Sequence, residues 1–191
     1  MARSSAGYDE PDGHGRWNMR RMALVGMVAA LLVASGGVWA RWAPSQPARD
    51  LQANRVLVEK SARRLTVLRD DKAITSYRIA LGSNPVGPKT RQGDGCTPEG
   101  TYVVDSRTAA SGFHRALHVS YPSPADKLAA TRAGVDPGGG IFIHGIKNGM
   151  GWLGRAHRLV DWTAGCIAVT NAEIEEIWRL VPNGTVVDIR P

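Results

Sequence analysis

The sequence is poor in cysteine, with only Cys96 and Cys166 among 191 residues. Two cysteines cannot form the disulfide framework of a small secreted domain, and they cannot supply a four-cysteine metal cage. Internal repeats are also lacking. Hydrophobic residues make up 43% of the chain, which is enough to build a core. Length and composition therefore indicate one globular domain with an appendage.

Positively charged residues are only modestly in excess over negatively charged ones, and the formal net charge is +7. Residues 1–50 hold six Lys or Arg against four Asp or Glu, which leaves +2 there and +5 in the remainder. A nucleic-acid footprint concentrates basic residues on one face or stripe. This even spread therefore argues against nucleic acid as a partner, whereas it suits a polymer that carries carboxylates.

A long uncharged run occupies residues 22–40, shortly after Arg16, Arg20 and Arg21. A helix of this length would span about 28 Å at roughly 1.5 Å per residue, close to the thickness of the bilayer core. The basic flank predicts an N-terminus in the cytoplasm, with the rest of the chain across the inner membrane. A buried core helix would leave that flank unexplained.

The same run has two interpretations as a targeting segment. Val38-Trp39-Ala40 resembles a signal-peptidase site, but the run is longer than a usual signal core of about 7–15 residues. We therefore favour an uncleaved anchor over cleavage near Ala40, and either one places the folded part in the periplasm. The predicted organisation is a disordered cytoplasmic tail (1–21), a transmembrane anchor or signal sequence (22–40), a linker (41–53) and a folded domain (54–190).

The folded domain shows many short β-rich runs and few helical ones. Gly- and Pro-rich segments such as 82–95 separate them, and a short helix is expected within 124–134. This pattern favours a mainly β fold, a β-sandwich or partly open barrel, with one packed helix after Cys166. The expected strands are 56–59, 64–68, 74–80, 101–105, 117–121, 141–143 and 185–189.

The clearest helix begins after Thr170. Thr170 and Glu173 have the spacing of a capping box, in which each side chain accepts a hydrogen bond from the other residue's backbone N–H. A buried stripe at helical spacing follows. It consists of Ile174, Ile177, Trp178 and Val181.

Cys166 is a candidate nucleophile. A lone cysteine is commonly a buried structural thiol, but Gly165 before it allows an unusual backbone conformation and close approach of a substrate. Thr163 adds a hydroxyl just upstream, and a sharp turn before a capped helix can direct amide N–H groups at an oxyanion. A free thiol has a pKa near 8.5, so a nucleophilic Cys166 needs a base or a cation nearby.

Histidines are the candidates for that base. His144 stands at the end of an apolar strand, where it is either hydrogen-bonded within the core or presented at a site. His157 is closer to the thiol in the sequence. His114 and His118 lie on or before a strand, and His14 belongs to the N-terminal tail.

His144-Gly145 and Thr163-Ala164-Gly165-Cys166-Ile167 together resemble the signature of bacterial L,D-transpeptidases. Residues 56–68 and Thr97-Pro98-Glu99-Gly100-Thr101-Tyr102 are similar to upstream segments of that family, and the resemblance covers residues 54–190. It implies Cys166 as nucleophile and His144 as general base. It also implies oxyanion or substrate roles for Gly165, Thr163 and Gly145.

The resemblance further implies acyl transfer on peptidoglycan stem peptides through a thioester, with no cofactor and no metal. The chain would work in the cell envelope, anchored to the inner membrane with its catalytic domain in the periplasm. The acceptor would be a stem-peptide amine, a lipoprotein lysine, a D-amino acid or water.

The sequence departs from the usual pattern at three places. Ala168 replaces an Arg or Asn, Ala164 replaces a His or Lys, and the separation between the histidine and the cysteine is longer than common. The longer loop is similar to that of a subgroup of the family whose members usually have alanine at the position of Ala168. We take His157, Arg158 and Trp162 as a candidate substrate loop, the alternative being a solvated charged loop.

Several other functions remain open. The strongest rival is a hydrolase of the same fold, with water as acceptor. A sortase-like enzyme would need an Arg in a strand after the cysteine, and a zinc peptidase would need ligands of tighter spacing than His118, His144, His157 and Cys166. A non-catalytic module that binds the cell wall would not need Cys166 and His144. Cys96 is either an incidental thiol or the partner of Cys166 in a reversible disulfide.

Overall fold

The computed structural model describes residues 52–191. The predicted cytoplasmic tail (1–21) and membrane helix or signal (22–40), together with most of the linker (41–53), lie outside the described residues. Within the described part, no helix is long and apolar enough to cross a membrane. The predictions about the membrane therefore stay predictions.

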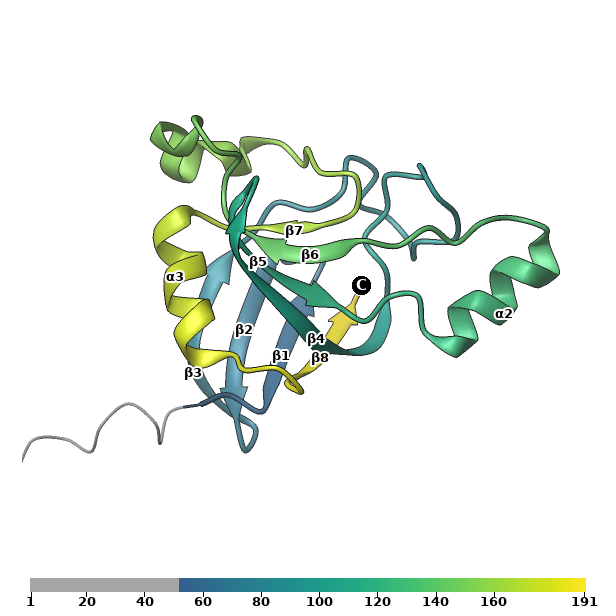
Figure 1. Cartoon of the computed structure of the whole chain (residues 1–191), viewed down its shortest axis with the longest axis horizontal. Helices are drawn as coiled ribbons and strands as arrows, with labels where there is room; N and C mark the ends of the chain where they lie inside the picture. Colours follow the sequence, from purple (N-terminus) through teal and green to yellow (C-terminus); the bar gives the residue numbers. More distant parts are fainter. Residues whose placement is uncertain (1–51) are drawn as a thin grey trace, which may run out of the picture. The chain divides into compact units, whose positions relative to one another are not determined.

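A single curled sheet dominates the part of the chain that the structure describes (Figure 1). Its strand order is β3-β2-β1-β8-β4-β5-β6-β7. The expectation of a mainly β fold with few helices is thus confirmed. The elements are β1 (Arg55–Glu59), β2 (Arg64–Arg69), β3 (Lys72–Arg78), β4 (Gly100–Ser111), β5 (His114–Val119), α2 (Pro124–Ala133), β6 (Ile141–His144), the 3₁₀ helix η2 (Gly151–Leu159), β7 (Ile167–Ala168), α3 (Asn171–Leu180) and β8 (Val186–Arg190).

The long strand β4 joins the two halves of the sheet. Its first part pairs with β8, from Gly100 opposite Ile189 to Val103 opposite Val186. Its second part pairs with β5 to form a hairpin, in which Ser111 is the last residue of β4 before the turn. Strand β4 therefore belongs to both halves, and its far end projects beyond β8 as part of the β4–β5 hairpin.

The two ends of the strand order meet through a pair of alanines. Ala80, which follows β3, and Ala168 in β7 exchange two backbone hydrogen bonds of 2.9 Å. The sheet is therefore a partly closed half-barrel rather than a sandwich of two separate sheets.

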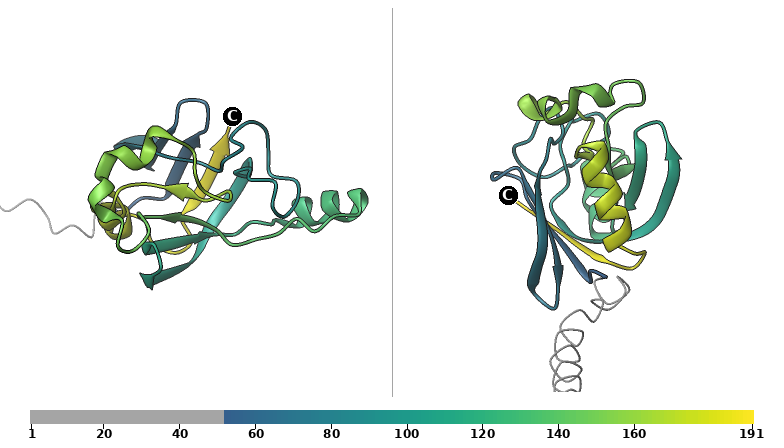
Figure 2. Two further views of the ribbon diagram at one scale, coloured as in Figure 1. Left: turned by 90° about the horizontal axis from the view of Figure 1, so that it is seen from above. Right: turned by 90° about the vertical axis from the view of Figure 1, so that its left-hand side faces the viewer.

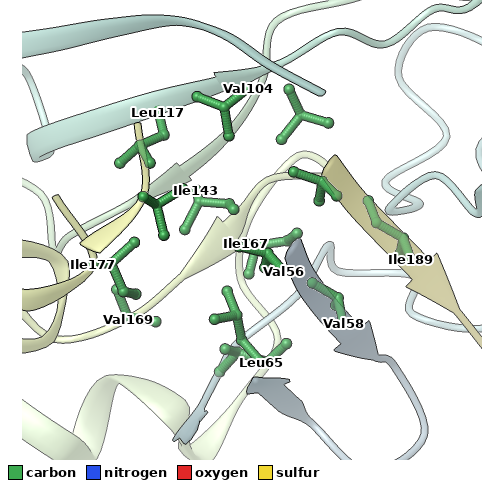
Figure 3. Close-up of a cluster of buried hydrophobic side chains, with 14 of the residues drawn as sticks. Val56, Val58, Leu65, Val104, Leu117, Ile143, Ile167, Val169, Ile177 and Ile189 are labelled. Carbon is green, nitrogen blue, oxygen red and sulfur yellow. The ribbon is translucent and has the colours of Figure 1, made fainter. Parts of the chain in front are cut away.

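The core lies inside this curl and under α3 (Figure 3). Ile174, Ile177 and Val181 are fully buried, as the helical stripe predicts, while Trp178 packs at the core margin. The capping box is also confirmed. The Glu173 amide donates to the Thr170 hydroxyl at 3.3 Å, and the Thr170 amide donates to the Glu173 carboxylate at 2.8 Å. Helix α3 is thereby held where it covers β5.

Two elements near the candidate nucleophile differ from the expectation. Cys166 leads first into the short strand β7, not directly into the capped helix, because residues 167–168 pair with β6. The segment 151–159 forms η2, in which Gly154 takes a non-helical conformation. Helix α2 was expected; it projects from the sheet (Figure 2) and buries only Ala130.

Candidate active site

A cavity of about 620 Å³ contains both Cys166 and His144 in its lining. It opens between the tip of the β4–β5 hairpin, the end of β6 and the turn before β7. Phe113 lines it from the hairpin, and Trp162 lines it from the turn. The structure therefore brings the predicted nucleophile and the predicted base to one place.

Strand alternation explains why these two side chains meet. β6 and β7 are parallel, with Ile143 opposite Ile167 and His144 opposite Ala168. Ile143 and Ile167 both belong to the hydrophobic core. Because successive side chains in a strand point to opposite faces, His144 points away from the core, as does Cys166, the residue just before Ile167. The site thus lies on the outer face of the same two strands whose inner face fills the core.

His144 has one ring nitrogen already engaged. Its side chain is buried, and Nδ1 lies 2.6 Å from the Gly145 carbonyl oxygen. A carbonyl oxygen only accepts, so Nδ1 carries the proton and the lone pair of the neutral ring is on Nε2. Burial lowers the pKa of His144, and the bond to Gly145 opposes that shift only in part. His144 is therefore a neutral acceptor near pH 7.

Cys166 is a protonated thiol in the same environment. Its Sγ lies 3.5 Å from the Gly140 carbonyl oxygen. Burial raises the pKa of Cys166, while a backbone hydrogen bond from Phe142 and the charge of Lys89 act in the opposite direction. Burial disfavours the charged form of both groups. The resting pair is therefore thiol and imidazole, not thiolate and imidazolium.

The turn before Cys166 requires glycine at position 165. Gly165 has φ of 130°, and a Cβ there would lie 2.6 Å from the Cys96 carbonyl oxygen. The Thr163 hydroxyl accepts from the Gly165 amide at 3.1 Å and donates to the Cys166 carbonyl at 2.7 Å. Thr163 thus holds the turn from inside. The Gly165 amide is therefore engaged within the turn.

Gly145 and Arg158 do not line the cavity. The Gly145 amide donates to the carbonyls of Phe113 and Arg115, and so joins β6 to the hairpin. The Arg158 guanidinium bonds the Glu173 carboxylate at 3.1 Å on the other side of the loop. In this structure Gly145 therefore links β6 to the hairpin, and Arg158 links η2 to α3, while their predicted roles at the substrate stay predictions.

Trp162 and His157 lie together on the inner side of the loop. Trp162 lines the cavity, and the centroid of its ring is 5.8 Å from that of His144. His157 is buried behind Trp162. Phe113, whose ring centroid lies 4.6 Å from that of His144, was not among the predicted site residues. No local pattern signals it, because Phe113 lies in the turn between β4 and β5, and only the pairing of β5 with β6 brings that turn to His144.

The second cysteine faces a different cavity. Cys96 lines a space of about 510 Å³ beside α2, and its Sγ lies 3.4 Å from the Asn84 side-chain amide. Both cysteines are free thiols, so the reversible disulfide suggested from the sequence is not formed in this structure. Among residues 52–191, no group of three or more His, Cys, Asp or Glu is arranged to hold a metal ion.

Comparison with known proteins gives a consistent family. The sequence model of the YkuD family, described as the L,D-transpeptidase catalytic domain, matches residues 53–189. "Putative L,D-transpeptidase YafK" of Escherichia coli K12 is 31% identical over 115 residues, 59% of this chain and 39% of the relative. "Putative L,D-transpeptidase YqjB" of Bacillus subtilis 168 is 28% identical over 131 residues, 68% of this chain and 67% of the relative.

Solved structures show the same fold. The helical cell shape determining protein Pgp2 from Campylobacter jejuni, as its K307A mutant, is similar with a TM-score of 0.57 and 27% identity. The match covers 74% of this chain and 48% of that one. Bd1075 of Bdellovibrio bacteriovorus gives 0.52 and 25%, over 74% and 49%. This chain thus spans about two fifths of the length of YafK and about half of these solved chains.

Proposed function

Since the chain belongs to the L,D-transpeptidase catalytic-domain family, we propose that it is a cysteine-dependent acyltransferase acting on peptidoglycan stem peptides. Cys166 is the nucleophile and His144 the general base. One observation carries the proposal: both side chains line one cavity, and the bond from His144 Nδ1 to Gly145 leaves Nε2 as an acceptor for the thiol proton.

The first half of the reaction forms a thioester. Because thiol and imidazole are both neutral at rest, the proton moves from Sγ to Nε2 of His144 as Sγ attacks the carbonyl carbon of the third stem residue. The tetrahedral intermediate then collapses, and the bond to D-alanine breaks. His144 returns the proton to the leaving amine, which departs as D-alanine.

The second half transfers the acyl group. An acceptor amine attacks the thioester carbonyl, and His144 takes a proton from it. The bond from carbon to sulfur breaks, and Cys166 regains its proton from His144. Water in the place of the amine gives hydrolysis, so the same site supports a carboxypeptidase as the alternative activity.

The setting of the activity is part of the proposal. The uncharged run at 22–40 and its basic flank support an inner-membrane anchor with the catalytic domain in the periplasm. A relative named for helical cell shape supports a role in remodelling the cell wall. Protease treatment of spheroplasts tests the orientation: a periplasmic domain is degraded in intact spheroplasts, whereas a cytoplasmic one is protected.

Intact-mass measurement tests the chemistry directly. The full chain is incubated with a disaccharide-tetrapeptide, and its mass is recorded with and without an added D-amino acid. We expect a covalent adduct equal to the donor minus D-alanine, which the added amine discharges as a new peptide. Discharge by water alone, with no aminolysis product, identifies the hydrolase instead.

The two cysteines provide matched variants for this test. Cys166→Ala is expected to abolish the adduct, and Cys96→Ala is expected to keep it because Cys96 faces the other cavity. A folded wild-type chain that yields neither adduct nor product would contradict the assignment to peptidoglycan.

A further inference from the structure

Four aromatic side chains from separate segments pack against one another beside the cavity. Phe113 from the hairpin tip lies 4.6 Å from His144 of β6 and 6.1 Å from Trp162, measured between ring centroids. Trp162 meets His144 edge-on at 5.8 Å, with an interplanar angle of 68°. The His157 ring of η2 also packs edge-on against Trp162, with a centroid distance of 6.3 Å and an interplanar angle of 81°. Trp162 is therefore the link between His157 and the proposed base.

The hydrogen bond between His157 and Trp162 has only one chemically sensible direction. Trp162 Nε1 lies 3.4 Å from His157 Nδ1, and an indole nitrogen can only donate. His157 therefore accepts at Nδ1 and carries its proton on Nε2. In the positively charged form both ring nitrogens would be donors, and Nδ1 would oppose the indole N–H.

The surroundings of His157 keep its ring neutral. The residue is 6% exposed, and its Nε2 has no hydrogen-bond partner. Burial lowers the pKa of His157 to about 4; the charges of Arg158 and His144 act in the same direction, and Glu173 on α3 acts against them. An unpaired buried N–H costs free energy. A phenyl ring would avoid that cost, so a histidine here is best explained by the acceptor at Nδ1.

We propose that His157 is a positioning residue of the active site: through its hydrogen bond to the indole of Trp162, it holds that ring against His144 and keeps water from the base. This rests on the proposed function only in naming His144 as the base. When the bond is lost, Trp162 gains freedom, and water reaches the imidazole of His144. Burial is the main cause of the lowered pKa of His144, so hydration raises that pKa towards its ordinary value.

Three variants separate this role from a purely structural one. His157→Phe keeps an aromatic ring and removes the acceptor, whereas His157→Asn keeps an acceptor oxygen near the position of Nδ1. Trp162→Phe removes the donor from the other side. We expect His157→Phe to lower kcat about tenfold with KM nearly unchanged, since it frees the ring that shields the base and does not itself line the cavity. Trp162→Phe should lower kcat by a similar factor, and its KM is not used as a criterion because Trp162 lines the cavity. His157→Asn restores most of the rate.

The pKa of His144 is the second measurement, and it does not depend on turnover. It is followed by NMR titration of the imidazole C–H signals in the full chain, with His144→Gln used for assignment. We expect the pKa to rise in His157→Phe and in Trp162→Phe and to stay near the wild-type value in His157→Asn. The double variant His157→Phe/Trp162→Phe should be no worse than either single one, because both remove the same bond.

Trp152→Phe is the matched control. Trp152 belongs to the same 3₁₀ helix but is 80% exposed, so its replacement should leave kcat and the pKa of His144 unchanged. Circular dichroism confirms that each variant is folded. An unchanged pKa of His144 in folded Trp162→Phe, or a loss of kcat in His157→Asn equal to that in His157→Phe, would overturn the proposal. If no variant, nor the wild type, turns over substrate, the proposed function fails while the titration still tests the contact.

Discussion

At the residue scale, the candidate active site shows two opposite pKa shifts with one cause. Burial raises the pKa of the Cys166 thiol and lowers that of the His144 imidazole. Each shift favours the uncharged form. The site therefore does not store a thiolate at rest, and in the proposed mechanism a neutral His144 takes the proton during attack.

The first prediction concerns the pH dependence of kcat/KM. The proposed mechanism needs neutral His144, and burial lowers its pKa below 6.5, so the rate should be constant at neutral pH and fall only as the pH drops through a midpoint below 6.5. The raised pKa of Cys166 predicts no loss on the alkaline side up to about pH 9. A profile from pH 4.5 to 9 checks this, and an acid midpoint at or above 6.5 would contradict it.

The same burial makes stability depend on pH. The unfolded chain binds protons at His157 near pH 6.5, whereas the folded chain binds them there only near pH 4. Between these values the unfolded state holds more protons, so the free energy of unfolding falls as the pH drops, by up to about 1.4 kcal/mol per pH unit for this one group. Activity and stability therefore weaken together in acid.

The second prediction concerns Gly165→Ala. The variant should lose about 3 kcal/mol of unfolding free energy, because it combines a φ of 130° with a Cβ only 2.6 Å from the Cys96 carbonyl oxygen. Gly149→Ala is the matched control, since Gly149 also has a positive φ, 83°, but open space around it. It should lose only about 1 kcal/mol. Urea denaturation measures both, and equal losses would show that the close approach to Cys96 is unimportant.

At the element scale, two helices share one capping device but differ in packing. Both α2 and α3 begin with a capping box, Ser123 with Asp126 and Thr170 with Glu173. Helix α3 buries Ile174 and Ile177 in the core. Helix α2 buries only Ala130, so its formation is coupled much less to the folding of the domain.

The third prediction uses this contrast. Thr170→Ala should lower the free energy of unfolding by about 1 kcal/mol, because α3 must be formed for the core to close. Ser123→Ala removes an equivalent cap but should fray α2 locally, with little change in global stability. Urea denaturation gives the global values, and hydrogen exchange of the α2 amides reports the fraying. A larger global loss for Ser123→Ala would be inconsistent with this view of α2.

At the scale of the whole molecule, a buried lysine links the β1–β2 hairpin to residues 87–99, the part of the chain before β4 that packs against the turn at Gly165. Lys60 follows β1 and is 2% exposed. Its Nζ donates to the Gly87 and Thr97 carbonyls and pairs with Glu99 at 2.8 Å. The same loop presents the Cys96 carbonyl that packs on Gly165. Lys60 thus holds the segment that packs against the turn before Cys166.

The fourth prediction follows from the burial of Lys60. Lys60→Met should cost about 3 kcal/mol, since it leaves the Glu99 carboxylate and two carbonyls without their cation. Arg64→Met is the control: its pair with Glu59 is open to solvent, with side chains 52% and 30% exposed, and should be worth less than about 1 kcal/mol. Urea denaturation compares the two, and similar losses would refute the role of the buried pair.

Local signals were enough to predict much of the fold and to single out the two residues on which the proposed function depends. The alternation of apolar and polar residues along a strand and the capping box at Thr170 both depend on residues close together in the chain, so the sequence alone reveals them. Cys166 after a glycine and His144 at a strand end are local facts as well. The segment at η2 was not predicted as a helix, because two glycines interrupt its helical pattern.

Only the tertiary structure decided which neighbours surround the candidate pair. Phe113 packs against His144 because β5 pairs with β6, which brings together residues far apart in the sequence. Of the loop residues, His157 turns inward to Trp162 while Arg158 turns outward to Glu173. The residues alone predicted a thiol and an imidazole as the candidate reactive groups, and the structure brings both to one cavity. Their charge states and their partners depend on burial, which is a property of the folded chain.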